Sequence, residues 1–162
     1  MQQKYLFFDN LMMEACNLSC SYCRPRKIGF QKGTAYEVQR IKDSVDKVDN
    51  FADYAILKLT GNGEITLLSD GLFEILDYFS EKNPERSVQL ITNGTLLDEE
   101  KIKKLSEIKN LSICFSLDGH TLKMNCSRDL NEQSLLKVKN NLESVLDAGI
   151  PLEINSVLTI HN

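Results

Sequence analysis

Three cysteines near the N-terminus, Cys16, Cys20 and Cys23, have the spacing CxxxCxxC. Cluster irons bind cysteine sulfur, so three thiolates this close together can hold one face of an iron–sulfur cluster. Such clusters usually take four protein ligands, and the two remaining cysteines, Cys114 and Cys126, lie far downstream. A fourth iron without a thiolate would keep an open position for a substrate or cofactor, as in catalytic zinc sites. The spacing therefore predicts an iron–sulfur site with one open iron.

Closely spaced cysteines have other uses, namely zinc half-sites, redox pairs and disulfide frameworks. A zinc knuckle normally brings a second pair of ligands, and neither CxxC nor HxxxH recurs in this sequence. A disulfide framework is disfavoured because the number of cysteines, five, is odd and the N-terminus shows no signal-peptide core. We therefore favour an iron–sulfur site over zinc or a chance spacing.

Apolar periodicity divides the rest of the chain into alternating strands and helices. Short, largely apolar runs predict strands at residues 11–13, 55–60, 88–92, 111–117 and 152–159. Apolar residues at spacings of three and four predict amphipathic helices, with core faces at Val38, Ile41, Val45 and Val48; Leu72, Ile75, Leu76 and Phe79; Ile102, Leu105 and Ile108; and Leu135, Val138, Leu142 and Val145. Ser69 or Asp70, and Asp98, are expected helix caps, and Gly149 with Pro151 ends the last helix.

This alternation predicts right-handed βαβ units and a parallel sheet of about five strands. Residues that could carry chemistry follow the predicted strands, at 16–23, 61–64, 92–94 and 116–119. The carboxyl ends of parallel strands lie along one edge of a sheet, where α/β proteins bind their ligands. Four segments that are distant in sequence are therefore expected to converge on one site.

Tyr22 lies directly before the last cysteine of the motif, and CxxxCxxC with an aromatic residue there resembles the signature of the radical S-adenosylmethionine (radical SAM) superfamily. GNGEI at residues 61–65 is similar to the Gly-Gly-Glu-Pro stretch of that family, although Asn62 and Ile65 replace the usual glycine and proline. TNG at 92–94 and SLDG at 116–119 are also similar to family motifs. The last is typical of the peptide- and protein-modifying branch that often carries a SPASM domain.

The resemblance covers nearly the whole chain and implies an α/β fold, a partial (β/α) barrel, with residues 1–162 forming one radical SAM core domain. It implies that Cys16, Cys20 and Cys23 bind a 4Fe–4S cluster and that S-adenosylmethionine is the cofactor. An electron from the reduced cluster would cleave the sulfonium and yield a 5′-deoxyadenosyl radical that abstracts a substrate hydrogen. A peptide or protein side chain is the substrate that this branch of the family suggests.

The same resemblance assigns roles at the cofactor site. Tyr22 would pack near the adenine, Glu64 would accept hydrogen bonds from the ammonium of the methionine moiety, and Arg128 would pair with its carboxylate. Arginine suits that role because its planar fork can bind both carboxylate oxygens. The other residues implied at the cofactor site are Gly61, Gly63, Asn93, Ser116 and Asp118.

These motif residues also have plain structural interpretations. Glu64 would be a solvated side chain of a tight turn, Asn93-Gly94 and Asp118-Gly119 would be turn signals, and Arg128 would be a surface arginine. The remaining candidates are expected outside the cluster: Cys114 as a small core residue, Cys126 in a loop on the ligand side, and His120 facing solvent.

The composition of the chain limits the kinds of partner that it is expected to bind. Hydrophobic residues make up 42% of the 162 residues, as expected for a packed core, and the net charge of −4 gives no electrostatic case for nucleic acid. No apolar run approaches the length of a membrane span, and a cytoplasmic protein with reduced thiols is expected.

The resemblance also bears on partners, because the sixth strand and the SPASM segment of the family have no counterpart in this sequence. Three interpretations stay open: a shortened form of a longer enzyme, a natural minimal member of the family, or one half of a complex in which a partner chain or a second copy covers the open last strand. The family also implies a reductant such as flavodoxin or ferredoxin. The alternative function is a non-catalytic iron–sulfur or partner-binding domain derived from such an enzyme.

Overall fold

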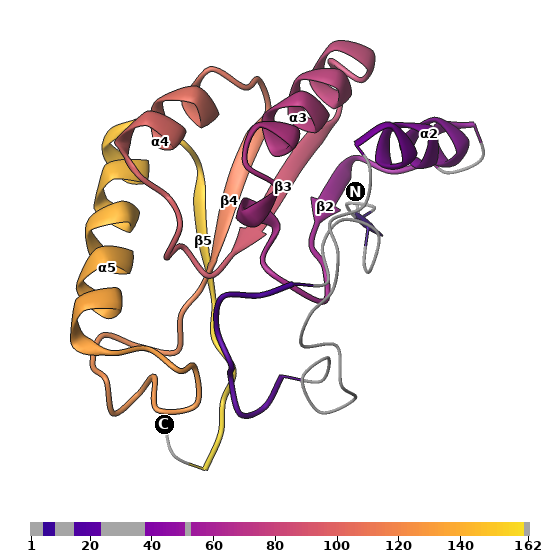
Figure 1. Ribbon diagram of the computed structural model, residues 1–162. Helices are drawn as coiled ribbons and strands as arrows, with labels where there is room; N and C mark the ends of the chain where they lie inside the picture. The colour runs from indigo at the N-terminus through magenta and orange to yellow at the C-terminus, as the bar shows by residue number, and fades with distance from the viewer. Residues whose placement is uncertain (1–4, 9–14, 24–37, 51–52, 161–162) are drawn as a thin grey trace.

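The computed structural model describes residues 5–8, 15–23, 38–50 and 53–160 (Figure 1). The strand predicted at 11–13 lies outside the described residues, and the first described strand, β1 (Tyr5–Phe8), covers the apolar run before it. The apolar period also predicts that the first helix begins at Thr34, and residues 34–37 lie outside the described residues as well.

Five parallel strands form one sheet in the order of the sequence. After β1 come β2 (Ile56–Leu59), β3 (Ser87–Thr92), β4 (Leu111–Ser116) and β5 (Leu152–Asn155). Because the order never reverses, every right-handed crossover places its helix on the same face, which gives a partial barrel rather than a doubly wound sheet. The predicted parallel sheet of about five strands is confirmed.

The last strand is shorter than the sequence predicted. β5 ends at Asn155, whose partner in the register is Ser116, the final residue of β4. Pairing therefore stops where β4 stops, and residues 156–159 continue without strand structure. In the part of the chain that the structure describes, β5 pairs with β4 alone.

Four α-helices and one short 3₁₀ helix connect the described strands. They are α2 (Val38–Asp49), η1 (Ile65–Leu68), α3 (Asp70–Lys82), α4 (Glu99–Ser106) and α5 (Glu132–Asp147). The Asp98 carboxylate caps α4 as predicted, accepting a hydrogen bond from the Lys101 N–H at 2.9 Å. Ser69 is the N-cap residue of α3, but its side chain makes no capping hydrogen bond.

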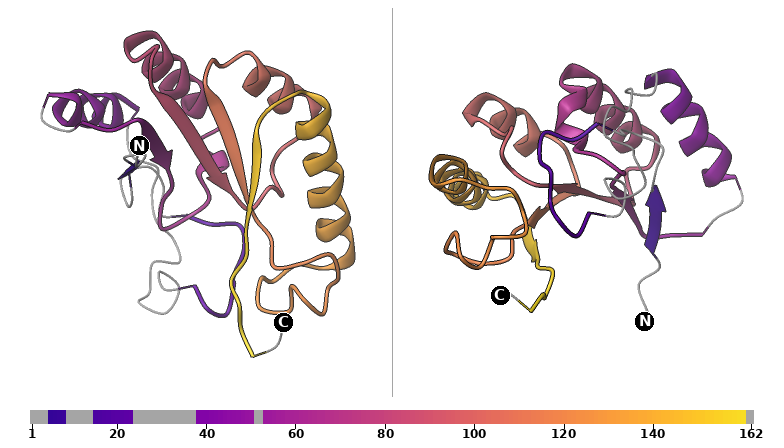
Figure 2. Two further views of the ribbon diagram at one scale, coloured as in Figure 1. Left: turned by 180° about the vertical axis from the view of Figure 1, so that it is seen from behind. Right: turned by 60° about the horizontal axis from the view of Figure 1, so that its bottom comes forward.

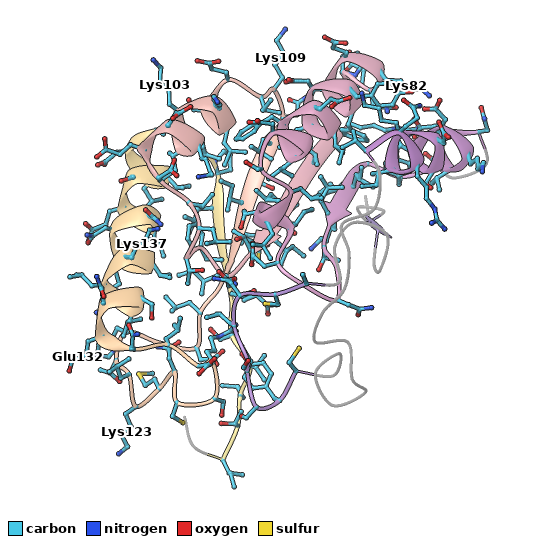
Figure 3. The ribbon with its side chains drawn as sticks, viewed as in Figure 1. Lys82, Lys103, Lys109, Lys123, Glu132 and Lys137 are labelled. Atoms are coloured by element: carbon cyan, nitrogen blue, oxygen red, sulfur yellow. The ribbon has the colours of Figure 1, made fainter. Side chains whose placement is uncertain are left out.

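The helices line one side of the curved sheet, and the hydrophobic core lies between the two (Figure 2). Alternate strand residues face this core, among them Leu57, Leu59, Leu90, Ile113 and Phe115. Their neighbours in the strands therefore line the inner face of the sheet, because strand side chains alternate between faces. Charged side chains such as Lys82, Lys103 and Lys137 point outward from the helices (Figure 3).

The inner face carries several polar side chains, among them Lys58, Gln89, Ser112 and Glu153. Cys114 lies on this face too, because it pairs with Glu153 and alternates with the core residues Ile113 and Phe115. It is 5% exposed, as expected for a small buried residue, but it is not part of the main hydrophobic core. Burial raises the pKa of the Cys114 thiol, and Glu153 adds to the rise while Lys58 opposes it.

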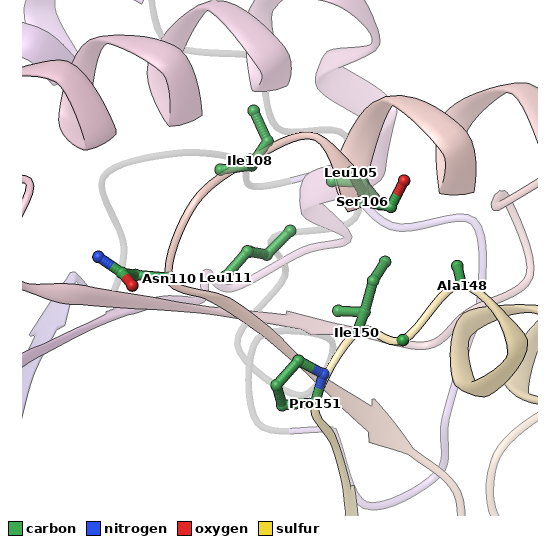
Figure 4. A pocket seen from close by; sticks show the side chains of 9 residues that line it. Leu105, Ser106, Ile108, Asn110, Leu111, Ala148, Ile150 and Pro151 are labelled. Atoms are coloured by element: carbon green, nitrogen blue, oxygen red, sulfur yellow. The ribbon is translucent and has the colours of Figure 1, made fainter.

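A cavity of about 300 Å³ lies at the amino ends of β4 and β5 (Figure 4). Leu105, Ile108 and Leu111 line one side, and Ile150 and Pro151 line the other. The cavity is at the opposite end of the strands from the segments that could carry chemistry, so it is not part of the candidate site.

None of the helices that the structure describes combines the length and the apolar composition that crossing a bilayer demands.

Gly94 offers a test of how tightly the turn after β3 packs. Its φ is +74°, and a Cβ there would lie 2.4 Å from Cε1 of Phe115. Gly94→Ala should lower the free energy of unfolding by about 3 kcal/mol, from left-handed strain plus overpacking.

Gly149 provides the matched control, because it shares the strain without the crowding. Its φ is +73°, and among the described residues no heavy atom beyond its chain neighbours lies within 4 Å of the position that a Cβ would take. Gly149→Ala should therefore cost only about 1 kcal/mol. Urea unfolding of both variants measures the difference, and equal losses would contradict the packing argument.

Candidate active site

The cysteine segment, residues 15–23, crosses the carboxyl ends of the strands (Figure 1). Cys16 is exposed, Cys20 and Cys23 are partly exposed, and all three are free thiols. Burial raises the pKa of Cys20 to about 11, and negative charge on Cys16 and Cys23 adds to the rise. Burial also raises the pKa of Cys16, to which Glu64 and Cys23 contribute. All three thiols belong to the one segment, residues 15–23, that crosses this edge of the sheet.

The first half of the segment is held by the turns that follow β2 and β3. The Glu64 N–H donates to the Ala15 carbonyl at 2.9 Å. The side-chain amide of Asn93 donates to Oδ1 of Asn17 at 3.0 Å, and the Asn17 amide donates to the Thr95 hydroxyl at 2.7 Å. The Asn17 side chain, directly after Cys16, is therefore held by two hydrogen bonds from the turn after β3.

Glu64 is 3% exposed, and its carboxylate accepts four hydrogen bonds. Oε1 accepts from the Thr66 N–H at 3.2 Å and from the hydroxyls of Thr66 and Thr92, each at 2.6 Å. Oε2 accepts from the Asn93 N–H at 2.7 Å. The interpretation of Glu64 as a solvated turn residue is wrong. It is a buried carboxylate that ties β3 to η1, whose N-cap it is.

The second half of the segment is held by residues 127–129. The Ser21 N–H donates to the Ser127 carbonyl at 2.8 Å, and the Ser19 N–H donates to Oδ2 of Asp129 at 3.0 Å. The Cys20 thiol donates to the Arg128 carbonyl at 3.3 Å. Asp129 has a φ of +59°, a conformation that Asp tolerates better than most residues. Both ends of the cysteine segment are thus anchored to the core domain.

Arg128 forms a buried ion pair with Asp118. Nη2 lies 2.7 Å from Oδ1 of Asp118, and the two side chains are 6% and 0% exposed. Nη2 also donates to the Asn155 carbonyl at 3.3 Å, and Oδ1 of Asp118 accepts from the Val157 N–H at 2.8 Å. The interpretation of Arg128 as a surface arginine is therefore wrong. The pair joins the ends of β4 and β5 to the loop that holds the cysteines.

Tyr22 completes this cluster. Its hydroxyl donates to Oδ2 of Asp118 at 3.3 Å, and the Arg128 guanidinium carbon lies 5.5 Å from the centre of its ring. Burial raises the pKa of the Tyr22 hydroxyl, and Arg128 opposes that rise. The aromatic residue of the motif is thus held at both its ring and its hydroxyl.

Comparison with known protein families shows to which family the chain belongs. The family model described as the Radical SAM superfamily matches residues 10–161. The chain belongs to the radical SAM superfamily. The resemblance inferred from the cysteine spacing and from the motifs at 61–65, 92–94 and 116–119 is confirmed.

Curated relatives of this radical SAM chain are enzymes with different substrates. Neomycin C epimerase of Streptomyces fradiae is 28% identical over 151 residues, covering 90% of this chain and 43% of the relative. A cysteine-type anaerobic sulfatase-maturating enzyme of Clostridium perfringens is 32% identical over 112 residues, covering 64% of this chain and 30% of the relative. The superfamily is thus certain, whereas the relatives do not agree on a substrate.

Solved structures give the same fold. A structure described as native anSMEcpe with bound AdoMet has a TM-score of 0.74 at 26% identity, covering 96% of this chain and 44% of that chain. Streptococcus suis SuiB bound to the precursor peptide SuiA has a TM-score of 0.77 at 18% identity, which shows the fold alone, covering 99% of this chain and 34% of that chain. This radical SAM chain spans less than half the length of these relatives.

The structure places every residue predicted for the site at the carboxyl edge of the sheet. Gly61 and Gly63 lie in the turn after β2, Asn93 in the turn after β3, and Ser116 at the end of β4. Glu64, Asp118, Arg128 and Tyr22 lie in the hydrogen-bonded clusters described above. Cys126 and His120 are exposed in the loop between β4 and α5, which fits the expectation for the histidine. The roles of these residues toward a cofactor stay predictions.

The donor set of the radical SAM chain fits a 4Fe–4S cluster. No three His, Cys, Asp or Glu side chains in the described ranges lie close enough to hold a single metal ion. A cluster makes a different demand, because its irons are several and the thiolates bind them at separate corners. Three free thiols held near one another at one edge meet that demand.

Arg128 also offers an unused donor to a ligand. Its Nε is buried and has no hydrogen-bond partner among the described residues. A buried N–H without an acceptor costs free energy, so a carboxylate or another acceptor oxygen from a ligand would be favourable there. The residues present therefore fit S-adenosylmethionine, which carries a carboxylate.

The sequence interpretation missed the residues that shape the site. Asn125 is 1% exposed; its Oδ1 accepts from the Asp118 N–H at 2.9 Å, and its amide donates to the Gly119 carbonyl at 2.6 Å. Asp129, Ser127 and Thr66 hold backbone or side-chain groups of the site in the same way. No local pattern marks these residues, although Asn17 could have been noted from its place inside the cysteine motif.

The buried ion pair offers a test of the site's architecture. Asp118→Asn keeps an acceptor for the Val157 N–H but leaves the charge of Arg128 without a buried partner, so the free energy of unfolding should fall by about 3 kcal/mol. Glu100→Gln, which breaks the exposed pair with Lys104 in α4, should cost less than about 1 kcal/mol. Urea unfolding of the metal-free chain measures both, and a loss for Asp118→Asn no larger than that for Glu100→Gln would show that the pair does not stabilise the site.

Proposed function

We propose that this chain is the core of a radical SAM enzyme in which Cys16, Cys20 and Cys23 hold a 4Fe–4S cluster. The observation that carries the proposal is the anchoring of three free thiols at the edge where Glu64, Ser116 and Arg128 also lie. When bound and reduced, the cluster supplies the electron that cleaves S-adenosylmethionine to a 5′-deoxyadenosyl radical. The protein's own work is to bind, orient and shield the reactants.

Different residues around the thiols are assigned to different groups of S-adenosylmethionine. Oε2 of Glu64 accepts one hydrogen bond from the described residues and, as a carboxylate oxygen, has capacity for a second, which the ammonium of the methionine moiety can donate. The flexible backbone of Gly61 and Gly63 permits close approach beside it. Nε of Arg128 and the Ser116 hydroxyl supply donors for the carboxylate. Tyr22, held by Asp118, offers its ring near the adenine.

The inner face of the sheet suits a polar substrate. Gln89 is 3% exposed, and its Oε1 has no hydrogen-bond partner within the part of the chain that the structure describes. Lys58 and Glu153 add charges of opposite sign to this face. An unpaired buried amide oxygen favours a ligand with an N–H or O–H donor.

We propose a peptide or protein side chain as the substrate. The support is the similarity to the sulfatase-maturating enzyme and to anSMEcpe, of which a further structure with bound AdoMet also contains a peptide. The relative named neomycin C epimerase supports a substrate of another class as the alternative. A reductant such as flavodoxin or ferredoxin, in a cytoplasmic setting that keeps thiols reduced, completes the proposal.

Iron content tests the proposal most directly. Chain reconstituted with iron and sulfide without oxygen should hold about four irons, and dithionite with S-adenosylmethionine should then give 5′-deoxyadenosine. Cys16→Ala, Cys20→Ala or Cys23→Ala should abolish both. The matched controls Cys114→Ala and Cys126→Ala should keep the iron.

Two outcomes of this experiment would contradict the proposal. Stoichiometric zinc with little iron, in protein purified without oxygen, would overturn the cluster. A stable cluster without any 5′-deoxyadenosine would favour a non-catalytic cluster-binding domain.

Ser116 tests the cofactor site with little structural disturbance. Ser116→Ala should weaken S-adenosylmethionine binding by about fivefold, the effect of losing one hydrogen bond of about 1 kcal/mol. Ser112→Ala is the matched control, because Ser112 lies on the same face of β4 but further from its carboxyl end. Equilibrium dialysis of the reconstituted variants measures the affinities, and equal effects at the two serines would refute the assignment.

A further inference from the structure

Asn141 lies on the buried side of α5, about one turn from both Val138 and Val145. Leu135, Val138 and Val145 on the same helix belong to the hydrophobic core, and Asn141, only 7% exposed, is buried with them. Asparagine is a poor helix former, and burying its amide costs free energy unless the amide is hydrogen-bonded. A specific interaction must therefore offset that cost.

Both hydrogens of the Asn141 side-chain amide are used on one turn. Nδ2 donates to the Gly94 carbonyl and to the Leu97 carbonyl, each at 2.9 Å. These carbonyls lie 47 and 44 residues earlier in the sequence, in the turn between β3 and α4. The helix thus holds the turn at two points, which fixes its position and its orientation together.

This turn reaches the cysteine segment through Asn93. Oδ1 of Asn93 accepts from the Thr95 N–H at 2.9 Å and from the Thr95 hydroxyl at 2.6 Å, so the side chain has one orientation. Its amide then donates to Asn17, and its backbone N–H donates to Glu64. Hydrogen bonds therefore connect α5 to the Gly94 and Leu97 carbonyls, and Asn93, which is bonded covalently to Gly94, continues the connection to Asn17 and to the buried carboxylate.

We propose that Asn141 is a positioning residue that holds the turn at residues 93–97 and, through Asn93, fixes Asn17 and the start of the cysteine segment. Without the two donors of Asn141 the Gly94 and Leu97 carbonyls lose their common anchor, and the turn gains conformational freedom. The hydrogen bonds of Asn141 and Asn93 do not involve a cofactor. Their consequence for cofactor binding rests on the proposed function.

NMR of the metal-free 162-residue chain tests the proposal. In Asn141→Leu the backbone amides of residues 93–97 should exchange with solvent about tenfold faster or more, and the side-chain amide resonances of Asn93 and Asn17 should shift. Asn140→Leu is the matched control, because Asn140 is the neighbouring asparagine on the same helix and is less buried, and it should change neither. Asn141→Ala removes the donors without adding bulk and gives the same comparison should the leucine variant not fold.

The outcomes separate positioning from stability. Faster exchange across all strands at once would mark a general loss of stability and would overturn the proposal. Faster exchange at 93–97 with unchanged Asn17 resonances would limit the effect of Asn141 to the turn itself and would also overturn the proposal.

In reconstituted chain, Asn141→Leu should keep about four irons and weaken S-adenosylmethionine binding about tenfold. A parent chain that takes up no iron would overturn the proposed function, and the NMR comparison would still decide the role of Asn141.

Discussion

The buried carboxylate of Asp118 is the group on which the arrangement of the site depends. It pairs with Arg128, accepts from the Tyr22 hydroxyl and accepts from the Val157 N–H. These three partners come from the loop before α5, the cysteine segment and the chain after β5, so one side chain at the end of β4 joins three separate segments. A buried charge is costly without a partner, so each segment is held in the position that keeps the pair satisfied.

Glu64 holds the other side of the site in the same way, and its hydrogen-bond donors among the described residues are all uncharged. Its four donors come from Thr66, Thr92 and Asn93, and hydrogen bonds to an ionised group are stronger than those between neutral groups. The Asp118 cluster therefore holds the second half of the cysteine segment, and the Glu64 cluster holds the first half. Protein contacts thus define the course of the segment in both halves.

The sequence was sufficient for the architecture and for the location of the site. Helix and strand periods predicted the described elements other than β1 and η1, and parallel pairing alone placed the segments at 61–64, 92–94 and 116–119 on one edge. The partners of Arg128 and Glu64 could not be predicted, because they lie across turns whose side-chain geometry no local pattern encodes. Asn141 was missed for a related reason: the apolar stripe through Val138, Leu142 and Val145 passes over it, and its two acceptors are 47 and 44 residues away.

Two side chains of opposite charge, Glu64 and the Asp118-paired Arg128, act on thiols in the two halves of the cysteine segment. Arg128 lowers the pKa of Cys20 against the larger effect of burial, whereas Glu64 raises the pKa of Cys16 together with burial. Because iron binds thiolates, uptake of a cluster must release protons from these thiols, and it is favoured as the pH rises. The negative charge that then gathers at the segment is opposed by Glu64 and balanced by Arg128. A ligand that brings an ammonium to Glu64 and a carboxylate to Arg128 would complete the same balance, and S-adenosylmethionine is a ligand of that kind.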